Sequence, residues 1–209
     1  MKTVSAHRCV CQDCNSNFYI NRQMINVINL DEDKDACVDF IKASVNRVTC
    51  PKCNANFTYE IPMLIFSCKD RFAIKVEPAF SPENSSEDFL PGFFNIFDFK
   101  YRKVSYYIEA LEKVRAFKDG LDDRYIEYVK LRFFSDEDAT PMDDVNLCYK
   151  ASDNNNLYFE KLDYNGFLLK DFQVLKDDVL PCIFSDEPQN PVWQQINRYT
   201  INDYIVKEN

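Results

Sequence analysis

The sequence predicts an α+β protein. We expect a four-cysteine, zinc-ribbon-like β domain with an inserted helix, then a helical hairpin and a small antiparallel sheet with a C-terminal helix. Three observations support this: a Cys-x-x-Cys knuckle occurs twice, short alternating apolar runs surround both copies, and later apolar residues recur at helical spacing. The 209 residues suffice for one large or two small domains. We divide them into 1–80 and 81–209, and the sequence leaves open whether the second part packs onto the first as one body.

The two knuckles share the eight-residue pattern Cys-x-x-Cys-Asn-x-Asn-Phe, which begins at Cys11 and again at Cys50. The two-residue spacing lets both sulfurs of a knuckle reach one ion, and four thiolates complete the tetrahedral shell of Zn²⁺. The chain must turn after each knuckle, and Asn15 and Asn54 tolerate the left-handed conformation better than most residues. We therefore predict a structural zinc site with four ligands: Cys11, Cys14, Cys50 and Cys53.

Residues near the knuckles are interpreted as packing residues. Phe18 and Phe57 follow the knuckles at equal offset and are predicted to pack over the site. Cys9 is either a spare ligand or a strand residue, and the second interpretation is favoured. His7 is an unlikely ligand because four thiolates already close the shell. The other cysteines have apolar neighbours and are expected to be buried: Cys37, Cys68, Cys148 and Cys182.

Composition excludes several function classes. The chain has three glycines, too few for a P-loop or a dinucleotide-binding fingerprint, and it lacks a Gly-x-Ser-x-Gly elbow. The longest apolar run, 61–66, is interrupted by Pro62 and is much shorter than a membrane helix. An odd number of cysteines, nine, and no apolar leader before Cys14 favour a reduced, cytoplasmic protein over a secreted disulfide scaffold.

The net charge of −9 is unevenly distributed. Residues 1–80 carry ten basic and nine acidic side chains, whereas residues 81–209 carry fifteen and twenty-five. This balance disfavours nucleic acid as a partner, because phosphate binding requires a basic footprint. A local basic patch in the first domain remains open, with Tyr19 and Tyr59 available for stacking on bases. Its candidate side chains are Arg8, Arg22, Lys42, Arg47, Lys52, Lys69, Arg71 and Lys75.

The first domain is expected to contain six strands and one helix. The helix runs from Asp31, as its N-cap, to about Ala43, with four apolar positions on one face: Ala36, Cys37, Phe40 and Ile41. Strands flank each knuckle, and a hairpin turns at 69–71. The predicted strands are 3–10, 18–28, 46–49, 56–60, 62–68 and 72–77.

The second domain is expected to follow a linker at 78–91, which contains three prolines, paired serines and acids. The aromatic segment 93–99 either docks onto the core or forms an exposed adhesive segment.

A helical pair occupies about 103–134, with Val104, Ile108 and Leu111 on the buried stripe of the first helix. Gly120 is expected to cap the first helix and Asp122 to begin the second, which would bury Ile126 and Val129.

The end of the chain is predicted to form a small sheet and one more helix. Four short runs separated by turn residues make the sheet at about 145–184, with strands at 145–150, 157–162, 167–172 and 179–184. Asn190 and Pro191 then offer a cap and a first-turn proline for a terminal helix at about 191–200.

The paired knuckles carry a family resemblance. The second, Cys50-Pro51-Lys52-Cys53, and the segment 114–124 are similar to the CpXC family of bacterial proteins. The first knuckle departs from the family pattern, because Gln12 stands where the family usually has proline. The resemblance spans roughly residues 1–135. It implies a zinc-ribbon-like fold and no activity.

Three function classes follow. The first is a non-enzymatic module that binds a macromolecule, most readily a protein, because a closed four-thiolate shell leaves zinc no position for substrate. The second is nucleic-acid binding through the basic residues of the ribbon. The third is an enzyme in the C-terminal domain that uses carboxylates: Asp122, Asp123, Asp136 and Asp138. No catalytic residue is assigned, no membrane contact is expected, and the oligomeric state stays open.

Overall fold

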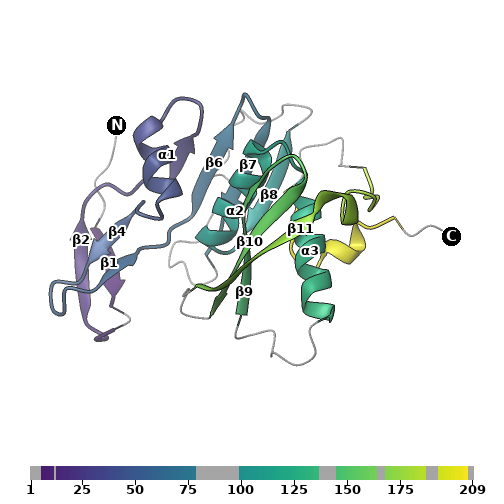
Figure 1. Ribbon diagram of the computed structural model, residues 1–209. Helices are drawn as coiled ribbons and strands as arrows, with labels where there is room; N and C mark the ends of the chain where they lie inside the picture. The colour runs from purple at the N-terminus through teal and green to yellow at the C-terminus, as the bar shows by residue number, and fades with distance from the viewer. Residues whose placement is uncertain are drawn as a thin grey trace.

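The computed structural model describes residues 6–11, 13–78, 99–136, 145–163, 168–186 and 193–206. In these ranges the chain forms two small hairpins, a four-stranded sheet, a three-stranded sheet and three α-helices (Figure 1). The predicted α+β class is confirmed. No helix in these ranges combines the length and the apolar character that crossing a membrane requires.

The two hairpins hold the knuckles between their strands. β1 (Ala6–Val10) pairs antiparallel with β2 (Asn17–Asn21), and β4 (Arg47–Thr49) pairs antiparallel with β5 (Asn56–Thr58). Their inward faces share a small apolar cluster. Phe18 and Phe57 belong to this cluster and pack on each other, with ring centroids 6.3 Å apart and the rings edge to face.

The central sheet has the order β3-β6-β7-β8. β6 (Met63–Ser67) and β7 (Phe72–Val76) form the predicted hairpin, and Arg71 in its turn has a φ of +55°. β3 (Val27–Asn29) pairs parallel with β6, and β8 (Lys100–Val104) pairs parallel with β7. β8 was not predicted, because its residues are largely basic.

Helix α1 (Lys34–Ile41) is shorter than predicted and begins later. Asp31 is not its N-cap. Its carboxylate instead accepts hydrogen bonds from the Ser67 hydroxyl and from the backbone N–H groups of Cys68 and Lys69. Asp31 therefore fixes the approach to α1 against the β6–β7 turn. Ile41 was predicted to lie on the apolar face of this helix, but its side chain is 55% exposed.

The predicted helical pair is confirmed as α2 (Tyr107–Lys118) and α3 (Asp123–Asp136). Gly120 follows α2 with a φ of +71°, and the carboxylate of Asp122 accepts the N–H of Arg124 at 3.0 Å. Helix α2 lies between β7 and β9 (Figure 1) and is buried on almost every side. Two residues of the predicted helical stripe differ. Val104 is buried as expected but ends β8 instead of belonging to the helix, and Ile108 is 44% exposed.

The predicted small sheet is formed by β9 (Val145–Ser152), β10 (Asn156–Asp163) and β11 (Leu168–Leu175), antiparallel in the order β11-β10-β9. The fourth predicted strand, 179–184, does not form. A 3₁₀ turn, η2 (Lys176–Asp178), redirects the chain, and Pro181 has no N–H to donate to a ladder.

The terminal helix predicted at 191–200 is also wrong over its described part. Residues 193–200 contain no helix, and only a 3₁₀ turn, η3 (Ile201–Asp203), follows. These residues are not helical because Gln194 pairs with the edge of β8. The backbone of Gln194 bonds to Tyr101 and Lys103 there, in a parallel bridge that requires extended conformation.

The division at residue 80 does not coincide with a break in the core. One hydrophobic cluster combines Ile28, Phe40 and Ile74 with Val114 and Phe117 of α2. The predicted linker 78–91 and aromatic segment 93–99 lie outside the described residues, apart from positions 78 and 99. Phe99 packs with the cluster of Leu64, Ala73 and Tyr101 on the opposite face of the sheet.

Candidate metal centre

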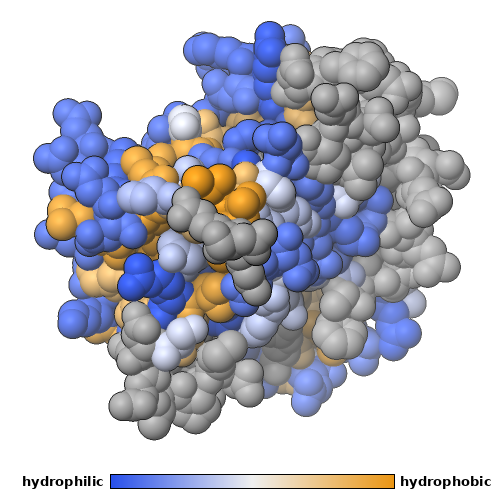
Figure 2. All heavy atoms as spheres, turned by 90° about the vertical axis from the view of Figure 1, so that its right-hand side faces the viewer, coloured by the Kyte–Doolittle hydropathy of each residue, from blue (hydrophilic) through white to orange (hydrophobic). Residues whose placement is uncertain are grey.

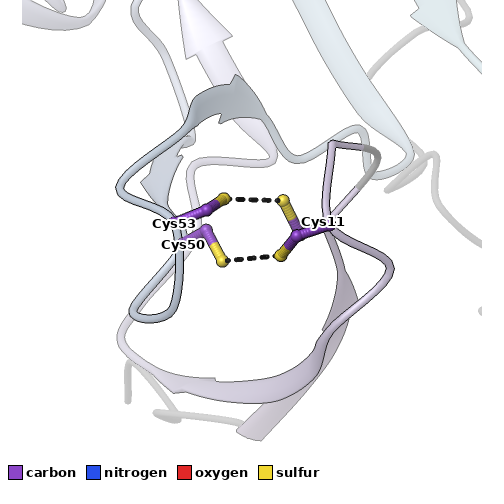
Figure 3. Close-up of side chains that lie close together, drawn as sticks. Cys11, Cys50 and Cys53 are labelled. Atoms are coloured by element: carbon purple, nitrogen blue, oxygen red, sulfur yellow. Dashed lines mark hydrogen bonds between the residues drawn. The ribbon is translucent and has the colours of Figure 1, made fainter.

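The fold brings the four predicted cysteines together. Their sulfur atoms all lie within 4.8 Å of one another. The closest approaches join the two knuckles: Cys11 to Cys53 at 3.6 Å and Cys14 to Cys50 at 3.8 Å (Figure 3). Sulfurs bound at about 2.3 Å to a tetrahedral ion lie about 3.8 Å apart. The spacing therefore fits one tetrahedral metal ion.

The knuckles position their thiols through the same local hydrogen bonds. In each, the N–H four residues after the first cysteine donates to that cysteine's carbonyl, at 2.9 Å from Asn15 and 3.0 Å from Asn54. Both asparagines have the predicted left-handed backbone, with φ of +54° and +61°. The N–H of each first cysteine donates onward to the carbonyl five residues later, at Ser16 or Ala55. Equal sequence pattern thus gives equal backbone geometry.

Ser16 connects the knuckles and was not predicted as a site residue. Its hydroxyl lies 3.1 Å from the sulfur of Cys14 and 3.3 Å from that of Cys50. These contacts lower the pKa of both thiols, that of Cys50 to about 6. The second knuckle has Ala55 at the equivalent position. This hydroxyl, present in one repeat and absent from the other, is the sequence signal that could have identified Ser16.

The thiol cluster can hold a cation. A hydrogen bond from the backbone of Ala55 lowers the pKa of Cys53. Burial and the other three thiols outweigh that effect and raise it to about 12. Four thiolates cannot collect at these distances without positive charge between them. Four sulfur donors in this arrangement suit a soft ion such as zinc or iron, so the residues present fit a metal.

A family model described as CpXC protein matches residues 9–130. This chain belongs to the CpXC family. The match contains both knuckles, the central sheet, α2 and the beginning of α3, and it confirms the predicted resemblance. Comparisons with curated proteins and with solved structures found no match.

The other sulfur and imidazole groups of this CpXC protein lie outside the cluster. Cys9 is buried and its thiol points to the carbonyl of His7 at 3.9 Å, while the ring of His7 packs on Tyr59. All nine cysteines are free thiols. The expectation that the remaining cysteines are buried holds for Cys148 but is wrong for Cys68, which is exposed in the β6–β7 turn.

Three of the basic side chains considered for nucleic-acid binding have local partners. Arg8 donates to Asn17 at 3.0 Å, and Arg22 donates to the carbonyl of Arg47. Lys75 is buried and paired with Glu77. On the outward face of the first hairpin, Arg8 lies directly opposite Tyr19, whose side chain is 69% exposed.

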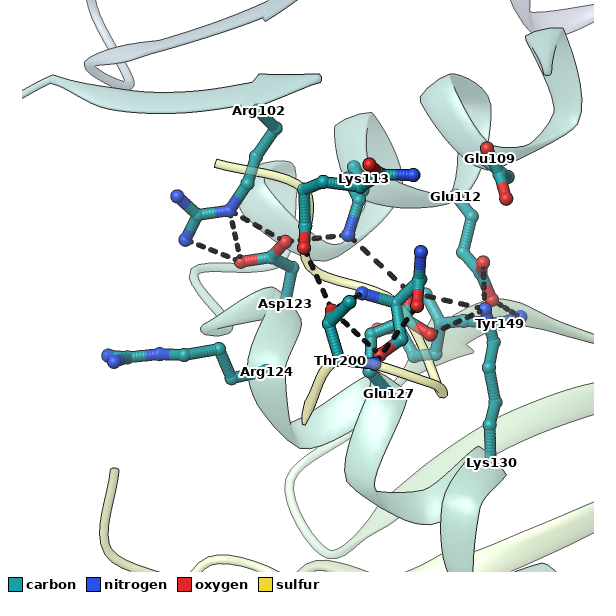
Figure 4. Close-up of polar contacts among 12 residues, drawn as sticks. Arg102, Glu109, Glu112, Lys113, Asp123, Arg124, Glu127, Lys130, Tyr149 and Thr200 are labelled. Carbon is teal, nitrogen blue, oxygen red and sulfur yellow. Dashed lines mark hydrogen bonds and ion pairs between the residues drawn. The ribbon is translucent and has the colours of Figure 1, made fainter. Parts of the chain in front are cut away.

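A second polar cluster, which sequence reasoning missed, lies between β8, α2 and α3 (Figure 4). It contains three cationic and three anionic side chains, all buried. We call it the buried ion network: Arg102, Glu112, Lys113, Asp123, Glu127 and Lys130.

Asp123 is one centre of the buried ion network. Its carboxylate accepts two hydrogen bonds at 2.9 Å from the guanidinium of Arg102 and one at 2.8 Å from Lys113. Burial alone would raise the pKa of Asp123, but Arg102 and Lys113 hold it well below its usual range. At the other end, Lys130 donates to Glu112, which also accepts the backbone N–H of Tyr149.

The buried ion network is structural. Its charges balance, and no buried side-chain nitrogen or oxygen among the described residues lacks a partner. The cavity beside Lys113 and Glu127 has a volume of about 10 Å³, room for roughly one water molecule. Of the carboxylates considered for catalysis, Asp122 pairs with Arg124 and Asp123 belongs to this network. The side chain of Asp136 and all of Asp138 lie outside the described residues.

Proposed function

We propose that this CpXC protein is a cytoplasmic, non-enzymatic protein-binding module whose four-cysteine centre holds a structural Zn²⁺. One observation supports this most strongly: four thiols from two knuckles converge within 4.8 Å. Four thiolates fill a tetrahedral shell, and a filled shell leaves the ion no position for water or substrate. A metal held in this way contributes to folding and not to chemistry.

The small size of the hairpins explains why an ion is required. β4 and β5 have three residues each, and the apolar cluster between the hairpins is small. Structural zinc in domains of this size contributes on the order of 10 kcal/mol to folding. The ion would join β1–β2 to β4–β5, and its removal should unfold this part of the chain.

The outward face of the β1–β2 hairpin supplies a surface for a protein partner. Tyr19 and Val10 are 69% and 52% exposed, and Arg8 lies beside Tyr19. Exposed tyrosine and arginine contribute strongly to many protein interfaces. Residues 6–26 and 44–61 carry four basic and two acidic side chains. A divalent ion with four thiolates adds two negative charges, so this region is close to neutral and favours protein over phosphate.

The structural role of the ion is tested with two exposed cysteines of the full chain. Cys53→Ser removes a ligand, and Cys68→Ser is the matched control outside the cluster. Zinc content and thermal unfolding are measured for both and for wild type. We expect loss of bound zinc and a lower melting temperature only in Cys53→Ser. A Cys53→Ser protein that unfolds like wild type would overturn the structural assignment.

Protein binding is tested by capture from the host lysate after nuclease treatment. Tyr19→Ala is compared with Tyr199→Ala, because Tyr199 is 63% exposed and belongs to the C-terminal segment. We expect a defined set of proteins that wild type and Tyr199→Ala retain and Tyr19→Ala loses. The proposal would be contradicted if Tyr19→Ala captured the same proteins as wild type, or if nuclease treatment removed the captured proteins.

Nucleic-acid binding through the ribbon is the second candidate. The observation that favours it is the cross-strand pair of Arg8 and exposed Tyr19, an arrangement suited to stacking on an unpaired base. The test measures binding of a fluorescent single-stranded oligonucleotide at increasing salt. Affinity that falls steeply with salt supports this candidate, and absence of binding at low salt rejects it.

A further inference from the structure

A groove lies between helix α3 and strand β11. Its volume of about 410 Å³ falls in the range of about 300–1,000 Å³ that is typical of small-molecule sites. Apolar surface is visible among polar side chains on the side of the molecule that carries α3 (Figure 2). The apolar side chains that line the groove all belong to the hydrophobic cluster between α3 and the three-stranded sheet: Val129, Phe133, Phe172, Val174 and Val179.

The apolar wall of the groove is held in place by its own packing. The ring of Phe172 stacks on Phe159 and on Phe133, with centroids 5.4 and 5.0 Å away and planes 12° and 16° apart. Val129 and Val179 are only 5% and 3% exposed, so they form the floor. A ligand would therefore meet an ordered apolar surface, and preformed surfaces lower the entropic cost of binding.

Two opposite charges line the same groove. Arg132 belongs to α3, and Asp178 belongs to the 3₁₀ turn η2 that follows β11. Both side chains are exposed. Neither forms an ion pair or a hydrogen bond with another residue that the structure describes. Each charge is therefore available to a ligand in the groove.

We propose that this groove binds a free α-amino acid with a large apolar side chain. The apolar side chain of the ligand would occupy the groove, and its carboxylate would pair with the guanidinium of Arg132. A planar guanidinium can hold a carboxylate through two parallel hydrogen bonds. The ammonium group of the ligand would pair with the carboxylate of Asp178.

The pair of charges disfavours other classes of ligand. A purely apolar segment would cover Arg132 and Asp178 without offering a partner to either, and desolvating an unpaired charge is costly. A simple anion would pair with Arg132 but would also face Asp178. A simple cation would meet the reverse arrangement. A zwitterion with an apolar body matches both charges and the apolar wall together.

The test measures the affinity of the 209-residue, zinc-loaded protein for L-phenylalanine by isothermal titration calorimetry. Two analogues separate the charges of the ligand, because hydrocinnamate lacks the ammonium group and phenethylamine lacks the carboxylate. We expect L-phenylalanine to bind with a dissociation constant below about 1 mM. Each analogue should bind at least about 10-fold more weakly, because it leaves one charge of the protein without a partner.

Matched variants assign each charge of the ligand to its partner. Arg132→Gln should weaken L-phenylalanine binding at least about 10-fold and abolish the preference over phenethylamine. Asp178→Asn should abolish the preference over hydrocinnamate. Asp177→Asn, at the neighbouring exposed position, and Arg47→Gln, at an exposed position of β4, are the controls and should bind like wild type. Circular dichroism should be unchanged in all four variants, because the substituted side chains are exposed.

The groove can be tested independently of the metal centre. The hairpins that hold the cysteines and helix α3 lie at opposite ends of the molecule, so zinc content should be the same in every variant (Figure 1). Absence of L-phenylalanine binding at millimolar concentration would overturn the proposal. So would hydrocinnamate that binds as tightly as L-phenylalanine, or an Arg132→Gln protein that binds L-phenylalanine like wild type.

Discussion

At the scale of single residues, the metal centre depends on groups around the thiols as well as on the thiols. Ser16 belongs to the first knuckle and contacts a sulfur of each knuckle. Its hydroxyl can donate to a thiolate but cannot replace one as a ligand in the four-sulfur set. It therefore lowers the pKa of both thiols and orients them, and orientation is one way in which groups around a metal shell raise affinity.

Removing this hydroxyl should weaken metal retention. In Ser16→Ala we expect apparent zinc affinity to fall about 10-fold, because two sulfurs lose a hydrogen-bond partner. The measurement is competition with a chromogenic chelator. Ser44→Ala removes a hydroxyl that bonds to Asp39 instead, and its zinc affinity should match wild type. Equal affinity in all three proteins would show that Ser16 has no part in the site.

Breaking the buried ion network should be costly. Asp123→Asn removes one negative charge and leaves Arg102 and Lys113 buried with excess positive charge. We expect the free energy of unfolding to fall by about 3–5 kcal/mol in urea denaturation. The exposed substitution Asp177→Asn should change it by less than about 0.5 kcal/mol. If Asp123→Asn lowered the free energy of unfolding only slightly, the ion pairs of Asp123 would not stabilise the fold as expected.

The same carboxylate predicts a pH dependence. The pKa of Asp123 in the folded protein lies below its unfolded value of about 3.9. Ionised Asp123 therefore contributes its full stabilisation above the unfolded pKa. This stabilisation is lost as the pH falls toward the pKa of Asp123 in the folded protein. The difference in unfolding free energy between wild type and Asp123→Asn should be constant near neutral pH and narrow below about pH 4. A difference that widens on acidification contradicts this assignment.

Residue-level prediction from sequence succeeded where the chemistry is local. The cysteines and the left-handed asparagines are specified by a short repeated pattern, so the sequence identified them directly. Ser16 and the buried ion network depend on partners distant in the chain, such as Arg102 and Asp123. A charged side chain is normally exposed, and only the tertiary structure shows that these six neutralise one another.

At the scale of elements, α2 is the helix on which the two sheets meet, and it ends in a defined way. Gly120 has a φ of +71°, and nothing lies within 4 Å of the position that a Cβ would occupy. The glycine is therefore needed for its backbone conformation and not for space. Such a residue after a helix satisfies the last carbonyls and redirects the chain toward α3.

Substitution of this glycine isolates the backbone effect. Gly120→Ala should reduce the free energy of unfolding by about 1–2 kcal/mol, because alanine disfavours the left-handed region. Gly120→Asn should cost less, since asparagine adopts that region more readily. Urea denaturation of both variants gives the comparison. Equal losses in the two variants would indicate a steric cause instead.

The elements predicted correctly are those whose patterns are periodic and bounded by turn residues: the hairpins, the helical pair and β9 to β11. Those predicted wrongly depend on long-range pairing. β8 forms because β7 offers an edge, and its buried Arg102 gives no apolar alternation to recognise. Residues 193–200 are extended because Gln194 pairs with β8, although Asn190 and Pro191 suggest a helix.

At the scale of the whole molecule, the C-terminal segment connects back to the first sheet. Gln194 bonds to β8 through its backbone, and its side-chain oxygen accepts a hydrogen bond from Arg102 at 2.6 Å. Ile196 and Ile201 are buried nearby. The family match ends at residue 130, yet this later segment covers one end of the buried ion network. Residues beyond the match therefore complete the body of the protein.

Two adjacent glutamines test this connection. Gln194→Ala removes a buried acceptor from Arg102 and should lower the free energy of unfolding by about 1–3 kcal/mol. Gln195→Ala changes an exposed neighbour of the same type and should be nearly neutral. Thermal and urea denaturation compare them. Equal stability of the two variants would show that the segment is only loosely attached.

We propose that the two knuckles hold one zinc ion through sulfur alone. X-ray absorption at the zinc edge of the 209-residue protein can test this proposal. We predict one zinc per chain with four sulfur neighbours at about 2.3 Å and no nitrogen or oxygen neighbour. A first shell containing nitrogen or oxygen, or a folded protein that retains no zinc, would contradict the proposed site.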